Sequence, residues 1–136
     1  MSVGRLGNVD NKNQNIELHK RVLCVCSAGV LRSPTAAVVL AGSGVNTRAA
    51  GLDKEYALIP VDDVLLTWAD EIVCMSWEQW SRLVDWCDSL NLNTPIICLE
   101  IEDDYSYMDP VLVELITTRY RASQQVLATG VGGGLE

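Results

Sequence analysis

The sequence predicts an α/β domain built as a three-layer sandwich, with a four-stranded parallel sheet between helices on both faces. Short apolar runs of strand length alternate along the chain with stretches of helical periodicity. Strands that alternate with helices are joined by right-handed crossovers, which produce a parallel sheet covered on both faces. The chain has 136 residues, 49% of them hydrophobic, which is enough for one domain with its own core.

The first strand and the helix after it have the clearest signals. Arg21–Cys26 is a continuous apolar run, and a polar loop separates it from Pro34–Ala41, where small and apolar residues favour a helix. Ser33 as N-cap and Pro34 at the first helical position are typical of a helix start. A weaker strand is predicted at Val45–Ala50.

The second half of the chain repeats this pattern. Glu71–Met75 and Pro95–Leu99 are predicted to be buried strands, and helices are predicted at 60–69, 76–90 and 109–127. In the first two of these helices, the apolar positions expected to face the core are Val61, Val64, Leu65, Trp68, Trp77, Trp80, Leu83, Val84 and Cys87.

Both ends of the chain lack the composition of a core. Residues 1–20 form a polar leader and residues 129–136 a glycine-rich tail, so both are expected to be flexible and 21–128 is predicted to be the domain. No run approaches the roughly 18 apolar residues of a membrane span, and no signal peptide precedes the first strand. The five cysteines, an odd number, lie in apolar segments, which favours a reducing, cytoplasmic setting.

The charge distribution argues against a nucleic-acid-binding protein, which needs clustered Lys and Arg. The net charge is −8, and residues 49–116 hold fifteen acidic and two basic residues. Residues 20–48 hold four basic residues and no acidic one, a pattern that predicts a small anion site. The alternative is that Lys20 and Arg21 only flank a strand and that Arg48 faces solvent.

The loop after the first strand has the residue types of an oxyanion site. It runs Cys26-Ser-Ala-Gly-Val-Leu-Arg32-Ser33, between a buried strand and a helix start, where parallel sheets bind their ligands. Backbone N–H groups of such a loop and the positive end of the helix attract an oxyanion. The planar guanidinium of Arg32 can donate two parallel hydrogen bonds to a pair of phosphate oxygens. The same donors stabilise a thiolate at Cys26. The residues expected to contact the bound group are Ser27, Ala28, Gly29, Val30, Leu31 and Ser33.

This loop resembles the signature of the low-molecular-weight protein tyrosine phosphatase family, which is a cysteine, five residues, an arginine and a serine near the N-terminus. The resemblance covers nearly all of residues 21–128, with Ala50–Gly51, Trp68–Met75 and Ile101–Tyr105 in the family's usual order. The segments Leu31–Thr35 and Tyr107–Pro110 are most similar to a shorter branch of predicted tyrosine phosphatases from bacteria and phages.

The resemblance implies a phosphomonoester hydrolase that works through a cysteinyl phosphate. Cys26 would be the nucleophile, Arg32 would bind the equatorial oxygens, and Ser33 would stabilise the thiolate. The implied substrate is a phosphotyrosine protein or a small aryl phosphate, with no metal or other cofactor and with no nucleic acid or membrane as partner. Gly29 stands where the family usually has Asn, and Leu31 stands where it often has a second cysteine, so the family's redox switch does not carry over.

Three carboxyl groups are candidates for the general acid, because the family's motif of Asp, Pro and Tyr is divided between two places in this chain. Asp103 lies two residues before Tyr105, as the family's acid does, and is the first choice, with Asp104 and Asp109 as alternatives. Neighbouring carboxyl groups favour the protonated state that an acid needs, whereas Asp109 before Pro110 has the features of a helix N-cap. Tyr105 and Tyr107 are the candidates for an aromatic wall of the substrate site.

Two other functions are compatible with the same loop. An arsenate reductase would need two further thiols near Cys26, for which Cys74 and Cys87 are available. A non-catalytic phosphoprotein-binding module would keep the anion loop without an effective acid.

Overall fold

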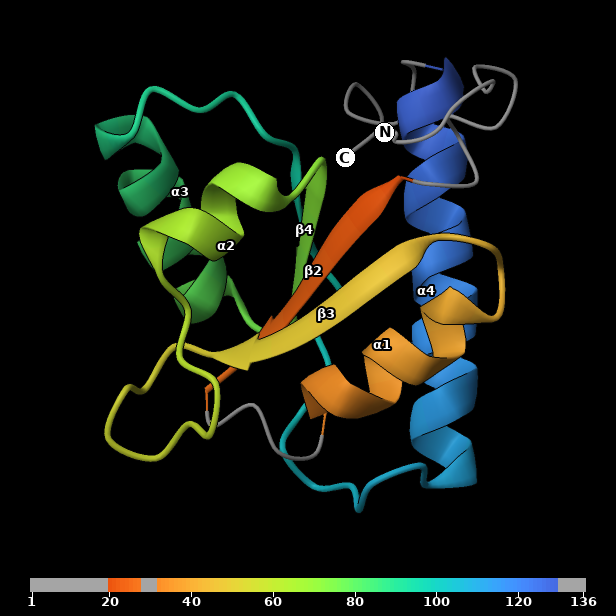
Figure 1. Cartoon of the computed structure of the whole chain (residues 1–136). Helices are drawn as coiled ribbons and strands as arrows, with labels where there is room; N and C mark the ends of the chain where they lie inside the picture. The colour runs from red at the N-terminus through yellow and green to blue at the C-terminus, as the bar shows by residue number, and fades with distance from the viewer. Residues whose placement is uncertain (1–19, 28–31, 130–136) are drawn as a thin grey trace.

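The chain folds into three layers, with a four-stranded sheet between two pairs of helices (Figure 1). The computed structural model describes residues 20–27 and 32–129, with side chains to residue 126, so most of the predicted leader and tail lies outside the described residues. The elements are β2 (Arg21–Cys26), α1 (Arg32–Ala41), β3 (Asn46–Gly51), α2 (Asp63–Trp68), β4 (Glu71–Cys74), α3 (Trp77–Ser89), β5 (Ile96–Cys98) and α4 (Pro110–Thr129).

The sheet has the order β3-β2-β4-β5, and every neighbouring pair of strands is parallel. Figure 1 shows α1 and α4 on one side of the sheet and α2 and α3 on the other. The predicted fold class is therefore confirmed. Within the described part of the chain, no helix combines the length and the apolar character needed to cross a membrane.

Side chains of β2 alternate between two hydrophobic clusters, one on each face of the sheet. Val22, Cys24 and Cys26 belong to the cluster with α1 and α4. Leu23 and Val25 belong to the cluster with α2 and α3. All five side chains are at most 3% exposed, so the end of β2 is held rigidly where the loop begins.

The start of α1 differs from the prediction. The helix begins at Arg32, so Ser33 is a buried residue of its first turn, and the prediction of Ser33 as N-cap is wrong. Its hydroxyl is engaged by the Cys26 thiol and the Ala50 carbonyl, which explains why it does not cap the helix.

The helix predicted at 60–69 is shorter in the structure. Asp62 is its N-cap, with Oδ1 accepting a hydrogen bond from the Leu65 N–H at 2.8 Å. Pro60 instead forms a parallel bridge with Gly51. Val64 was expected to face the core but is 72% exposed, because the helix places Leu65 and Leu66 on its buried side.

Trp77 was also expected to face the core, and it is 55% exposed. Its indole N–H donates to the Glu100 carboxylate, and its ring packs edge-on against Trp80 at 5.5 Å between centroids. The buried side of α3 is formed by Gln79, Leu83 and Cys87.

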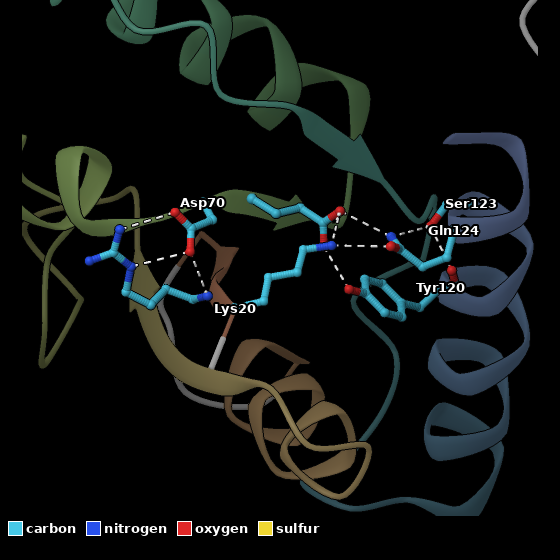
Figure 2. Close-up of polar contacts among 7 residues, drawn as sticks. Lys20, Asp70, Tyr120, Ser123 and Gln124 are labelled. Carbon is cyan, nitrogen blue, oxygen red and sulfur yellow. Dashed lines mark hydrogen bonds and ion pairs between the residues drawn. The ribbon is translucent and has the colours of Figure 1, made fainter. Parts of the chain in front are cut away.

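Polar side chains hold the amino end of the sheet together (Figure 2). The Glu71 carboxylate, 1% exposed, accepts hydrogen bonds from the Tyr120 hydroxyl at 2.6 Å, Gln124 Nε2 at 3.0 Å and Lys20 Nζ at 3.1 Å. Burial and the neighbouring Glu71 raise the pKa of Tyr120 above its usual range. This cluster attaches the C-terminal helix α4 to β4 and to the start of β2.

At the carboxyl end of the sheet, the segments that follow the other strands converge on the end of β2 (Figure 1). The Leu52 N–H donates to the Cys26 carbonyl at 2.9 Å, and the Asp53 N–H donates to the Ser27 carbonyl at 2.7 Å. The Ile101 N–H donates to the Met75 carbonyl at 2.9 Å. These bonds fix the surroundings of the loop that follows Cys26.

Candidate active site

Cys26 is the last residue of β2, and its thiol lies against the first turn of α1. Its Sγ is 3.2 Å from the Ser33 Oγ, to which the thiol donates. The Ser33 hydroxyl in turn donates to the Ala50 carbonyl over a longer distance of 3.4 Å. Because a hydroxyl can rotate, Ser33 can donate to a Cys26 thiolate instead when the thiol loses its proton.

Arg32 opens α1 and is 6% exposed. Its Nη1 donates to the Ile101 carbonyl at 2.8 Å, and its Nε is 3.6 Å from Asp103 Oδ1. A guanidinium has five N–H donors, more than these two partners within residues 20–27 and 32–129 use. Arg32 is therefore a buried cation close to Cys26 in the chain, with donor capacity for a bound anion.

Of the three candidate acids, the structure brings Asp103 to Arg32. The Asp103 side chain is 71% exposed, so its carboxyl group can exchange protons with solvent. Asp109 instead accepts a hydrogen bond from the Val111 N–H at 2.9 Å, directly before α4. Its expected role as a helix cap is confirmed, and Asp104 is exposed.

The segment from Ile101 to Asp109 is anchored to α1 at both ends. Arg32 holds the Ile101 carbonyl, and Thr35 Oγ1 accepts the Met108 N–H at 2.9 Å. Thr35 is fully buried, and no pattern in the sequence marks it as part of the site. The backbone of Met108 has a φ of 61°, in the left-handed region that costs energy for a residue with a side chain, and the Thr35 contact helps to hold it there.

The two tyrosines near Asp103 differ in exposure. Tyr105 is half-buried and packs against the cluster of α1 and α4, while Tyr107 is 52% exposed. Packing against the core therefore fixes Tyr105, which lies in the same segment as Asp103.

Gln79 is a polar residue of this region that the sequence analysis missed. It lies in the first turn of α3, is 1% exposed, and donates from Nε2 to Ser27 Oγ at 3.1 Å. The spacing from Ser76 to Gln79 is that of a capping box, which could have indicated its role at the helix start. The contact with Ser27 depends on the pairing of β4 with β2, which brings the start of α3 to the end of β2, and it has no local signal.

Four of the residues expected to contact the bound group, Ala28, Gly29, Val30 and Leu31, lie outside the described residues. Among the described residues, no group of three His, Cys, Asp or Glu side chains is placed to hold a metal ion.

The four basic residues of segment 20–48 do not share one site. Lys20 and Arg21 pair with Glu71 and Asp70 at the amino end of the sheet, and Arg48 lies over the Trp68 ring at 4.4 Å. The reading of this stretch as one cationic region around an anion is therefore wrong for these three residues, because each is engaged elsewhere. Arg32 is the member that adjoins Ser33, the residue in contact with the candidate nucleophile.

The other thiols lie away from Cys26 or are deeply buried. Cys74 and Cys87 belong to the cluster with α2 and α3, across the sheet from Cys26. Burial raises the pKa of both thiols, and it raises that of Cys24 in the same way. An arsenate reductase would need Cys74 and Cys87 to exchange with Cys26, and the sheet stands between them.

No family model matches this sequence, and no curated protein does so either. Solved structures match over most of the chain. The YwlE arginine phosphatase from Geobacillus stearothermophilus is 18% identical with a TM-score of 0.55, and the match covers 80% of this chain and 96% of that one. A low-molecular-weight phosphotyrosine phosphatase from Vibrio cholerae O395 is also 18% identical, with a TM-score of 0.54 and coverage of 78% and 97%.

A third match is Wzb from Vibrio vulnificus in complex with benzylphosphonate, at 14% identity and a TM-score of 0.51, covering 78% of this chain and 95% of that one. At these identities the likeness establishes a shared fold, which is that of the low-molecular-weight phosphatases.

Proposed function

We propose that the protein hydrolyses phosphomonoesters, with phosphotyrosine proteins or small aryl phosphates as substrates, through a cysteinyl phosphate on Cys26. The observation that carries the proposal is the 3.2 Å contact between Cys26 Sγ and Ser33 Oγ at the junction of β2 and α1, next to the buried Arg32. Sharing the fold of a phosphotyrosine phosphatase and an arginine phosphatase supports it.

In the first step, the Cys26 thiolate attacks phosphorus in line with the leaving oxygen. The S–P bond forms as the P–O bond to the aryl group breaks, and the electron pair goes to the leaving oxygen. Arg32 and the loop's backbone N–H groups stabilise the equatorial oxygens. Ser33 turns its hydroxyl from the Ala50 carbonyl to the sulfur, because the bond to Ala50 is long and easily replaced.

Asp103 protonates the leaving oxygen in this proposal. It is the candidate acid that contacts Arg32, and an anion bound by Arg32 would compete with its carboxylate for the guanidinium.

In the second step, water attacks the phosphorus of the cysteinyl phosphate. The Asp103 carboxylate left by the first step accepts a proton from this water, the S–P bond breaks, and the electron pair returns to Cys26 as a thiolate. Inorganic phosphate leaves, and the starting state is restored.

The test is hydrolysis of p-nitrophenyl phosphate and of a phosphotyrosine peptide by the wild type and by Cys26→Ser. We expect loss of turnover by about 10⁴-fold or more in Cys26→Ser, and competitive inhibition of the wild type by vanadate. Cys98→Ser is the matched control, because Cys98 is a half-buried strand cysteine outside this site. Full activity in Cys26→Ser would overturn the proposal.

The same assay separates the other candidate functions. Phosphotyrosine binding by the wild type without turnover would identify a binding module. Arsenate-dependent oxidation of thioredoxin would identify an arsenate reductase. A phosphoarginine peptide in the substrate panel tests for arginine phosphatase activity, which is the activity named for one structural neighbour.

A further inference from the structure

We propose that Gln79 is a positioning residue of this site, which fixes the first residue of the loop after Cys26 through its hydrogen bond to Ser27. The inference rests on the proposed function, since it assigns Gln79 a role in placing the loop that binds the phosphoryl group. Gln79 itself lies in α3, on the element that follows β4.

The orientation of the Gln79 side chain is fixed by the backbone around it. Its Oε1 accepts hydrogen bonds from the Met75 N–H at 2.8 Å and the Ser76 N–H at 3.2 Å. Both of these groups can only donate, so the amide oxygen must face them. The amide nitrogen therefore points the other way, toward Ser27 Oγ at 3.1 Å.

Capping of α3 does not by itself require a glutamine. A glutamate at this position of a capping box also accepts hydrogen bonds from the backbone N–H groups. The group that a glutamine adds is the donating NH₂, and in this protein it is directed at Ser27. With Gln79 only 1% exposed, solvent does not compete for this donor, so the contact is retained.

Ser27 is held from two sides. Its carbonyl accepts the Asp53 N–H at 2.7 Å from the segment after β3, and its side chain is held by Gln79 from the segment after β4. Ser27 follows the nucleophile directly, so its placement sets the direction in which the loop leaves Cys26. A displacement of about 1 Å in such a loop can lower the rate by roughly 100-fold.

The experiment is a double-mutant cycle with Ser27→Ala, Gln79→Met and the combined variant, measured as kcat/KM for p-nitrophenyl phosphate and as vanadate affinity. Methionine is close to glutamine in length and removes the amide. We expect Gln79→Met to lower kcat/KM by about 10- to 100-fold when Ser27 is present, and by much less when residue 27 is alanine.

A purely capping role would give a different result. Gln79→Met would then lower the melting temperature, and its effect on kcat/KM would be the same with serine or alanine at position 27, which would overturn the inference. Gln124→Met is the matched control, because it removes an amide that donates to Glu71 at the far end of the sheet. We expect it to lower the melting temperature and leave kcat/KM unchanged.

The outcome separates this inference from the proposed function. If the wild type turns over substrate and the cycle shows no coupling, the role of Gln79 is refuted and the phosphatase proposal stands. If the wild type binds vanadate without turnover, the coupling between Ser27 and Gln79 is measured from the vanadate affinities of the variants, and the same coupling is expected. If it neither binds vanadate nor turns over substrate, both proposals fail.

Discussion

The two ends of the sheet both bury a charged side chain, and they partner it differently. At the amino end, the Glu71 carboxylate receives three hydrogen bonds of 2.6 to 3.1 Å from side chains of the chain preceding β2 and of α4 (Figure 2). At the carboxyl end, the partners of the Arg32 guanidinium among the described residues are the Ile101 carbonyl, at a short distance of 2.8 Å, and the Asp103 carboxylate, 71% exposed, in an ion pair of 3.6 Å.

This difference distinguishes a structural cluster from the candidate binding site. A buried charge needs compensation wherever it lies. Short bonds to side chains fixed in the structure compensate Glu71 permanently, so this cluster stabilises the fold. A long ion pair to an exposed carboxylate is weak and easily replaced, so under the proposed function Arg32 would exchange Asp103 for a phosphoryl group.

Removal of the exchangeable partner should affect rate and leave stability almost unchanged. We expect Asp103→Asn to lower kcat/KM by about 100-fold or more for phenyl phosphate, whose leaving group needs a proton, and much less for p-nitrophenyl phosphate, because kcat/KM reports the first step, before Asp103 acts as the base. The free energy of unfolding should change by less than about 1 kcal/mol, because the ion pair is largely exposed on the Asp103 side. Kinetics with both substrates and urea denaturation measure the two quantities.

Controls for this variant come from the neighbouring acids. Asp104→Asn should leave kcat near the wild-type value. Asp109→Asn should leave both rate and stability unchanged, since asparagine caps a helix as well as aspartate does. A selective loss of rate on phenyl phosphate in Asp104→Asn or Asp109→Asn, with wild-type behaviour in Asp103→Asn, would move the acid to the other residue.

Removal of the fixed carboxylate should give the opposite result. Glu71→Ala leaves the Tyr120 hydroxyl, Gln124 Nε2 and Lys20 Nζ without their common acceptor. We expect the free energy of unfolding to fall by about 2 to 4 kcal/mol, with kcat/KM unchanged at temperatures where the variant stays folded. A large loss of kcat/KM in the folded variant would show that the two ends of the sheet are not independent.

The smallest expected effect is a pH dependence at Tyr120. Burial, followed by the adjacent Glu71, raises the pKa of Tyr120 in the folded state. As pH rises above about 10, the unfolded chain releases the phenol proton and the folded chain retains it. Stability should therefore fall with rising pH in the wild type.

Tyr120→Phe isolates this contribution. At pH 8 we expect the variant to be less stable than the wild type by about 1 to 2 kcal/mol, because it lacks the bond to Glu71. The gap should narrow between pH 8 and pH 11, as only the wild type has a phenol to titrate. A gap that stays constant over this range in denaturation experiments would contradict the assignment.

The parts of the candidate site that sequence analysis could assign are the parts close together along the chain. Cys26, Arg32 and Ser33 lie within eight residues at a strand-to-helix junction, and the strand, the loop and the helix each have local signals. The fold class followed from the alternation of strands and helices and was confirmed. The cap of α4 at Asp109 was also confirmed, because an N-cap depends on neighbouring residues alone.

Contacts between distant segments could not be predicted in this way. Gln79 meets Ser27 because β4 pairs with β2 and places α3 beside it, and no local pattern encodes that pairing. Ser33 was assigned to the helix cap because serine before proline usually has that role, whereas the Cys26 thiol and the Ala50 carbonyl engage its side chain. Trp77 was predicted to lie in the core because of its position in the helical period. Periodicity alone cannot predict its hydrogen bond to Glu100, which comes from a distant segment.

The central claim is that Cys26 carries the phosphoryl group during turnover. The most direct measurement is a rapid acid quench of the wild type during hydrolysis of an aryl phosphate, followed by mass spectrometry of the peptide that contains residues 21–32. We expect a phosphoryl group on Cys26 that forms within the first turnover and disappears when the substrate is exhausted. Turnover with no phosphoryl group on this peptide, or with the group on another residue, would contradict the account.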